Sequence, residues 1–287
     1  YEKASATLLA AEPEHAPLKV VDQTQSNEWG ALRSHVEARL VMLRQWRNSW
    51  WTENWSTLSE YILPRRSIWL TQSTGGAPTP NNMNRGRPLN NAIKDPTATF
   101  AVRVCAAGMM SGLASVSRQW FKVLPAVKNI ELDSDARRWL DEIEVRTYNV
   151  LAGSNFYNAF AQECEDLVVF GTAPSIIYED EADIIRCYNP AVGEYYLASD
   201  ATLRVDGLYR QFVMTIEQIV GFFGLENCPP DVQSLWQAKG SALDTERTIA
   251  HSIEPNFDVP GCPKLPGGFP WREVYWVWGA GGSYPLS

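Results

Sequence analysis

The sequence predicts an α+β protein in which helices come first and a strand-rich half follows. Up to Gly171, apolar residues recur every three or four positions, and beyond it they alternate in short runs bounded by Gly, Pro and Asp. The chain has 287 residues, 45% of them hydrophobic, which is enough to bury a core. We expect an N-terminal arm over 1–26, a mainly helical region over 27–171 and a strand-rich region over 172–287.

The helical region opens with a long amphipathic helix that ends near Trp50 and is capped by Ser26 or Asn27. Its apolar stripe consists of Trp29, Leu32, Val36, Leu40, Leu43, Trp46 or Arg47, and Trp50. A second helix runs from Trp55 toward Pro64, which cannot continue it. Residues 70–92 are dense in Gly, Pro, Asn and Thr and predict a long loop of the kind kept for function or for a partner.

Asp95-Pro96 predicts the start of a third helix, with Asp as the N-cap and Pro at the first helical position. Small residues keep much of this helix slim, so that it can approach its neighbours closely; they are Ala106, Ala107, Gly108, Ser111 and Gly112. The following "QWFKVLP" alternates and predicts a short strand. Two more helices come next, divided near Gly153 and ended at Gly171, with Ser134 and Ser154 as caps.

Short alternating runs predict the strands of the second half, punctuated by "DEAD", Pro190 and Asp206-Gly207. They are "APSIIYE", "DIIRCYN", "GEYYLA", "DGLYRQFVMT", "ERTIAHSIEP" and "REVYWVW". Thr215 to Gln218 form a capping box that starts a short helix ending at Gly224. A further short helix is expected after Pro229-Pro230. The chain begins without methionine and ends directly after a strand-like run, so we expect it to continue beyond its C-terminal end.

Composition excludes several classes of protein. The 25 basic and 33 acidic residues give a net charge of −8, which argues against a surface that grips phosphates by bulk charge. Five widely spaced cysteines without a C-x-x-C pair indicate neither a disulfide framework nor a zinc cluster, and a reducing compartment fits best. No window approaches the roughly 18 consecutive apolar residues of a membrane helix, so we expect no membrane partner.

Catalytic signatures are equally scarce. The three histidines lack zinc-hydrolase spacing, and neither a P-loop nor a G-x-S-x-G motif is present. Two acidic sets offer carboxylates for magnesium binding or acid–base chemistry, although charges at helix ends and hairpin tips are usually solvated. These sets are Glu163, Glu165 and Asp166, and Glu179, Asp180, Glu181 and Asp183. We predict no catalytic residue, no cofactor and no metal site.

Twelve tryptophans leave two interpretations open. Aromatic side chains can form a sugar-binding platform, which with paired carboxylates suggests a monomeric carbohydrate-binding or glycoside-hydrolase-like protein with a deep cleft. At helical or strand spacing, however, tryptophan more often fills cores and subunit interfaces. We therefore favour an assembly subunit over an enzyme.

Three passages support that choice by resemblance to a known family. "WSTLSEYILPRRSIW" (55–69), "AVRVCAAGMMSGLASVSRQWFKVLP" (101–125) and "GLYRQFVMTIEQIVGFFG" (207–224), followed by "IAHSIEPN", resemble passages of the portal, or head-to-tail connecting, proteins of short-tailed bacteriophages. They occur in family order with near-family spacing. The sequence departs from the family at Val116, where proline is expected, and in length, since family chains run on into further stem, clip and crown elements.

The resemblance implies a portal-like wing and stem architecture and a ring, taken as a dodecamer, at one capsid vertex of the virion, assembled in the host cytoplasm. Double-stranded DNA would pass through the ring without sequence specificity during packaging and ejection. The implied partners are the major capsid protein, the terminase large subunit and tail adaptor or neck proteins; another neck adaptor ring is the remaining alternative. Candidate packing or subunit contacts are Trp120, Phe121, Gly108, Met109, Gly112 and Leu113, and candidate DNA or intersubunit contacts are Arg65, Arg66, Arg85 and Arg87.

Overall fold

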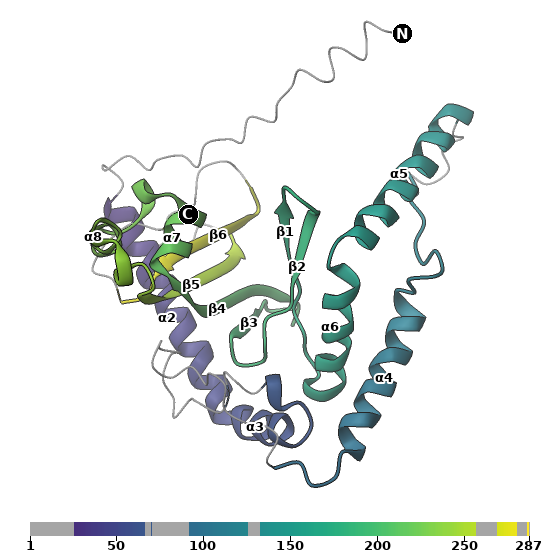
Figure 1. Ribbon diagram of the computed structural model, residues 1–287, viewed down its shortest axis with the longest axis horizontal. Coiled ribbons are helices and arrows are strands. Elements are labelled where there is room, and N and C mark those ends of the chain that lie inside the picture. The colour runs from purple at the N-terminus through teal and green to yellow at the C-terminus, as the bar shows by residue number, and fades with distance from the viewer. Residues whose placement is uncertain are drawn as a thin grey trace, which may run out of the picture. The chain divides into compact units, whose positions relative to one another are not determined.

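The computed structural model describes residues 26–66, 70, 92–125, 133–256, 269–279 and 286, with side chains from residue 29 onward (Figure 1). The chain divides into two compact units. One, the sheet unit, comprises 1–46, 77–81 and 196–287; the other, the helical unit, comprises 47–76 and 82–195. The predicted arm over 1–26 and loop over 70–92 lie outside the described residues, apart from residues 26, 70 and 92.

The order of the elements confirms the α+β class: helices occupy the first part and antiparallel strands dominate after Gly171. The helices are α2 (Ser26–Trp50), α3 (Thr52–Tyr61), η2 (Pro64–Arg66), α4 (Thr97–Leu113), α5 (Ser134–Gly153), α6 (Phe156–Phe170), α7 (Ile216–Phe223), η4 (Leu225–Asn227), α8 (Pro230–Ala238) and η5 (Gly240–Ala242). The strands are β1 (Ile176–Asp180), β2 (Ile184–Tyr188), β3 (Tyr195–Ser199), β4 (Val205–Thr215), β5 (Glu246–Pro255) and β6 (Trp271–Val277). The division into three regions stays a prediction.

The sheet unit is built on a four-stranded sheet in the order β3-β4-β5-β6, with β5 antiparallel to both of its neighbours (Figure 1). Successive side chains of a strand point to opposite faces, so β4, β5 and β6 contribute to two cores. One core joins the sheet to α2; its buried residues are Leu32, Val36, Leu40, Leu43, Tyr196, Ala198, Tyr209, Ala250, Val274 and Trp276. The predicted α2 stripe is therefore the core face up to Leu43, whereas Trp46 and Trp50 are exposed and Arg47 is buried.

Helices α7 and α8 cover the opposite face of the sheet. The Thr215 hydroxyl accepts the backbone N–H of Gln218, and the Gln218 side chain accepts the N–H of Thr215, which confirms the predicted capping box. Helix α7 then ends at Gly224, whose φ of +81° suits glycine. Helix α8 starts at Pro230, at the position where a missing N–H costs nothing.

A polar network, buried except at Glu273, lies on the α7 face of this sheet. Arg210 Nε donates to His251 Nδ1 (2.8 Å), so the imidazole carries its proton on Nε2 and donates to Glu273 Oε1 (2.8 Å). The His251 ring stacks on Tyr275 at 4.0 Å, and the Tyr275 hydroxyl donates to the same Glu273 oxygen. Burial lowers the pKa of His251, while the hydrogen bond from His251 lowers the pKa of Glu273. His251 is therefore held on both ring nitrogens inside the sheet unit.

We expect acid to weaken the sheet unit through His251. The unfolded chain takes up a proton below about pH 6.5, whereas the folded imidazole stays neutral to lower pH, so the free energy of unfolding falls as pH drops. Between pH 7.5 and 5.5 the loss should be about 1 kcal/mol in urea unfolding. His251→Gln keeps one donor and one acceptor but cannot titrate, and it should flatten this dependence. An equal pH dependence in both proteins would contradict the assignment.

In the helical unit, α4 packs along α6, as Figure 1 also shows. The N-cap residue of α4 is Pro96, not Asp95 as predicted; the Asp95 carboxylate, one position earlier, accepts from the backbone N–H (3.0 Å) and the hydroxyl (2.6 Å) of Thr97. Pro96 stands one position before the helix, not at its first residue as predicted. Likewise Asp133 caps α5 and Ser134 is already helical, while Asn155 is the cap residue of α6.

Strands β1 and β2 form a separate antiparallel hairpin after α6. The chain enters it through Gly171, which has a φ of +74° and ends α6 as predicted. The side chain of Asn155 holds β2 from outside, because its amide donates to the carbonyl of Cys187 (2.7 Å) and accepts the Cys187 N–H (2.8 Å). The β2 edge of the hairpin is therefore bound to Asn155, at the start of α6 in the same unit.

Residues 119–125 form no strand within the described part of the chain. Their exposure nevertheless alternates, with Phe121, Val123 and Pro125 half-buried and the intervening residues exposed. The predicted alternation is present, but the segment bonds to the side chains of a helix in place of a neighbouring strand.

Candidate subunit interface

An aromatic cluster surrounds the predicted contact residue Trp120. Its indole stacks parallel to Phe156 with ring centroids 6.2 Å apart, and it meets Phe121 edge to face at 4.8 Å. Phe121 in turn stacks on Tyr148 at 4.4 Å. Such pairs add roughly 0.5–1.5 kcal/mol each beyond the area that they bury. Trp120 and Phe121 thus connect the 119–125 segment to α5 and α6.

The same segment is fastened through its backbone. The Tyr148 hydroxyl accepts the N–H groups of Trp120 (2.6 Å) and Phe121 (2.8 Å) and donates to the Phe121 carbonyl (3.0 Å). Two residues on, the Val123 N–H reaches Glu144 Oε2 (3.1 Å), and Glu144 is buried. Side chains of α5 therefore replace the partner strand, which is a role for Tyr148 and Glu144 that the sequence pattern did not reveal.

Helix α4 presents an apolar surface to solvent opposite its packed face. Phe100 is 69% exposed and Val104 57% exposed, and Leu113 near the helix end is exposed as well. Exposed small residues lie between them, and a Cβ added to Gly108 or Gly112 would meet no described atom within 4 Å. The opposite side, with Val102 and Ala106, is buried. Met109 is half-buried.

A solvent-exposed helix normally carries charged or polar residues on its outer face. On α4 the one charged residue is Arg103, and the rest of the outer face is apolar, small or hydroxyl-bearing. The four candidate residues of this helix therefore divide: Gly108 and Gly112 lie on the exposed face, Met109 borders the packed side, and Leu113 continues the packed side at the exposed helix end. A contiguous exposed apolar face of this kind is typical of a protein contact.

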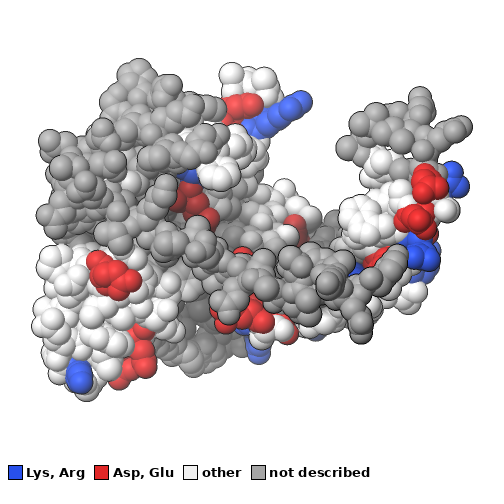
Figure 2. Space-filling model, turned by 90° about the horizontal axis from the view of Figure 1, so that it is seen from above, with Lys and Arg blue, Asp and Glu red and all other residues white. Residues whose placement is uncertain are grey.

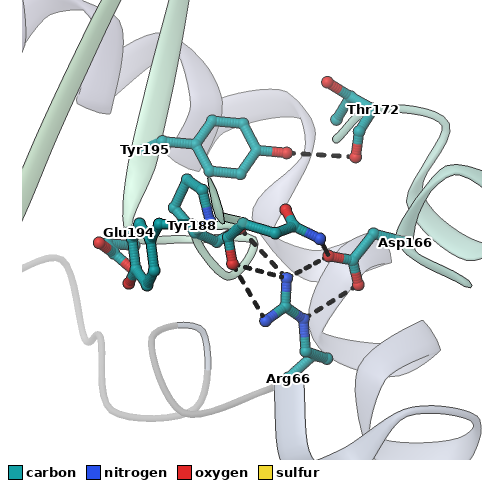
Figure 3. Close-up of polar contacts among 8 residues, drawn as sticks. Arg66, Asp166, Thr172, Tyr188, Glu194 and Tyr195 are labelled. Atoms are coloured by element: carbon teal, nitrogen blue, oxygen red, sulfur yellow. Dashed lines mark hydrogen bonds and ion pairs between the residues drawn. The ribbon is translucent and has the colours of Figure 1, made fainter. Parts of the chain in front are cut away.

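Arg66 lies in a polar cluster that Figure 3 shows in detail. Its guanidinium donates two hydrogen bonds to Asp166, from Nε to Oδ1 (3.0 Å) and from Nη2 to Oδ2. It also donates to the backbone carbonyls of Asn189 and Pro190. Asp166 is 1% exposed, and burial raises its pKa while the hydrogen bonds and charge of Arg66 oppose that shift. Arg66 thereby ties η2 to α6 and to the turn after β2.

The remaining candidate arginines are placed differently. Arg65, next to Arg66 in η2, is exposed. Arg85 and Arg87 lie outside the described residues. In the view of Figure 2, red and blue side chains are scattered over a mostly white described surface, so the described basic groups in view do not gather into one patch. Contact of these arginines with DNA or a neighbouring subunit stays a prediction.

The predicted acidic sets also separate in the structure. Asp166 is an ion-pair partner, whereas the tip of the β1–β2 hairpin carries Glu179, Glu181 and Asp183 in exposed positions. Among the described residues, no group of three or more His, Cys, Asp or Glu side chains is placed to hold a metal ion. None of the described helices has both the length and the apolarity needed to cross a bilayer.

Comparison with known families decides between the two interpretations of the aromatic residues. Residues 33–283 match the family described as bacteriophage head to tail connecting protein. The chain belongs to this connector family. The carbohydrate-binding alternative is not favoured, since the match covers both units and includes all three passages that carried the resemblance.

Two curated relatives agree with this membership. The chain is 33% identical over 254 residues to a "Probable portal protein" of Bordetella phage BPP-1, and 32% identical over 237 residues to the "Portal protein" of Salmonella phage epsilon15. These alignments cover 88% and 83% of this chain but 42% and 40% of the relatives. The connector chain therefore spans about two fifths of the length of the curated relatives it matches.

Proposed function

We propose that this connector chain is part of a portal subunit that assembles into a ring at one vertex of a phage capsid. The observation that supports this most directly is the family match over residues 33–283. The fold is consistent with it, because α4 exposes an apolar face that a neighbouring copy would cover. In a ring each subunit uses two different patches, one toward each neighbour, so much apolar surface is needed on one chain.

The ring would serve as the conduit for double-stranded DNA during genome packaging and ejection, and as the attachment point of the tail. The net charge of −8 suits this role. Each phosphate that binds a basic group gains affinity through counterion release, and this affinity would slow a DNA duplex that slides through the ring. An acidic channel wall does not bind the phosphates and lets the DNA pass. The proposed partners are other copies in a dodecamer, the major capsid protein, the terminase large subunit and tail adaptors. ATP hydrolysis would belong to the terminase motor, so that this subunit is not an enzyme.

Native mass tests the proposal. Mass photometry and negative-stain microscopy of the full-length protein should show closed rings of about a dozen subunits with a central hole. A protein that stays monomeric at concentrations where its relatives form rings would contradict the proposed function.

Trp120→Ala should impair folding or ring assembly, because the indole stacks on Phe156 and closes the aromatic cluster over α5 and α6. We expect it to lower stability by roughly 1–3 kcal/mol in urea unfolding, less than for a fully buried Trp since 37% of the residue is exposed. Trp50→Ala, which removes a 76% exposed indole, is the matched control and should leave stability within about 0.5 kcal/mol. Normal rings and normal stability from Trp120→Ala would count against this role.

A further inference from the structure

The β1–β2 hairpin carries an exposed β-branched residue at the left-handed position of its turn. Ile184 follows the three-residue turn 181–183 and has a φ of +69°, a conformation that glycine adopts readily and a β-branched residue resists. Its side chain is 60% exposed, so the strain is not offset by burial in the described fold. The turn accounts for the conformation but not for the choice of isoleucine over glycine, and retained strain of this kind is often found at sites of interaction. Ile177 on β1 is exposed to the same extent.

The outer edge of β1 is available to a further strand. Cys187 directs its backbone groups away from β1, toward Asn155, so the pair Ile177–Cys187 is not hydrogen-bonded within the hairpin. By alternation, the backbone groups of Ile177 and Glu179 point outward from β1 as well. Among the described residues, none bonds to these outward groups. The β1 edge, defined as Ile177 and Glu179 with the acidic tip 180–183, is therefore an open strand edge.

The 119–125 segment has a second open edge in the same unit. Phe121 and Val123 turn their N–H groups to α5, so the backbone groups of Lys122 and Leu124 face the opposite way. No described partner is recorded for these groups. The side chains of Lys122 and Leu124 are exposed, Leu124 by 70%. We call this the Lys122 edge; Arg118 precedes it.

The two edges are complementary in chemistry. The β1 edge offers the exposed Ile177 beside Glu179, Glu181 and Asp183, and the Lys122 edge offers Leu124 beside Lys122, with Arg118 before it. Adding a strand to an open edge supplies main-chain hydrogen bonds, while side-chain charges select partner and register. Because both edges belong to one folded unit and each is already held in place there, the matching edge comes from another molecule.

We propose that the β1 edge of one copy pairs with the Lys122 edge of a neighbouring copy. The contact joins two different patches, so it is heterologous and propagates around a ring. It also gives the strained Ile184 a role, since the residue holds the end of the hairpin against the neighbour. The inference rests on the proposed ring and names one of its subunit contacts.

Charge reversal on the full-length protein tests the pairing. Glu179→Lys and Lys122→Glu should each lower the fraction of protein in rings at least tenfold at a concentration near the wild-type midpoint, as measured by mass photometry. The variant with both changes should recover, because the two charges are exchanged. An equimolar mixture of the two single variants should also recover through rings in which the variants alternate, since every contact in such a ring joins opposite charges. Glu60→Lys, an exposed charge reversal on α3 outside both edges, should assemble normally.

The outcomes separate this inference from the proposed function. Wild-type rings with both single variants unaffected, or with no recovery in the exchanged variant, would overturn the pairing and leave the portal proposal standing. Absence of wild-type rings would overturn the portal proposal itself. If an unrelated protein or another segment of the chain occupies the Lys122 edge, Lys122→Glu weakens assembly but Glu179→Lys does not, which also overturns the pairing.

The variant Ile184→Gly tests whether rings can be lost without misfolding of the subunit. Glycine relieves the positive φ, so the melting temperature should be unchanged or raised while ring formation falls severalfold. Leu203→Gly is the matched control: Leu203 also has a positive φ (+64°) and is 87% exposed, but it lies in the turn before β4. It should gain stability without any loss of rings. Full assembly of Ile184→Gly would remove Ile184 from the contact.

Discussion

We expect Asp166→Ala to destabilise the helical unit by about 3 kcal/mol, which is toward the lower end of the usual cost of breaking a buried ion pair. Asp166 is 1% exposed and its carboxylate is held in two places by Arg66, so its removal leaves the guanidinium without its counter-charge. The Arg66 side chain is 19% exposed and keeps two backbone carbonyls as acceptors, which limits the cost. Urea unfolding, with hydrogen exchange to assign the loss to α3, α6 and β2, measures it.

A matched exposed ion pair tests whether burial of the Arg66–Asp166 pair causes the large expected loss of stability. Glu142 and Arg146 on α5 approach to 2.6 Å, but their side chains are 57% and 75% exposed. Glu142→Ala should therefore cost no more than about 0.5 kcal/mol. In addition, Arg66→Ala combined with Asp166→Ala should cost less than the sum of the single changes, because neither charge is left alone. Equal losses of unfolding free energy for Asp166→Ala and Glu142→Ala would show that the buried ion pair stabilises the protein no more than an exposed one.

Local signals predicted much of the fold. The stripe from Leu32 to Leu43 gave the core face of α2, the Thr215–Gln218 capping box gave the start of α7, and Gly171 gave the end of α6. Each depends on residues a few positions apart, where spacing and backbone preference act directly. The observed helix starts differed from the predicted ones by one position at Pro96 and at Ser134. At each start two neighbouring residues, Asp and Pro or Asp and Ser, are both suited to the N-terminal end of a helix.

Contacts between distant residues could not be predicted in this way. Arg66 and Asp166 are 100 positions apart, and nothing in the spacing of "ILPRRS" or "ECEDLV" indicates that they pair. The 119–125 segment has the alternation of a strand, yet Tyr148 and Glu144 on a helix take up its hydrogen bonds. A period of two shows which residues face a packed surface; it does not show whether that surface is a strand or a helix.

The sheet unit contains a second buried charge, on which we base the other large prediction. Glu254 on β5 accepts from Arg272 Nε (2.7 Å) and Nη2 with one oxygen, and from the Tyr209 hydroxyl with the other. Burial and the charge of Glu254 raise the pKa of Tyr209, so the phenol stays protonated and remains a donor. The Arg272 side chain is 1% exposed, which leaves it no route to water. We expect Glu254→Ala to cost about 3–5 kcal/mol in urea unfolding.

Two further variants separate the charge of Glu254 from its hydrogen bonds. Glu254→Gln keeps an oxygen acceptor in a side chain of the same size but removes the negative charge, so its cost should lie between those of the wild type and Glu254→Ala. Combining Glu254→Gln with Arg272→Met removes both charges and should recover part of the lost stability, since no unpaired charge stays buried. If the combination is instead as unstable as the two single changes added together, the pair acts through separate contacts and the buried charge is not the cause.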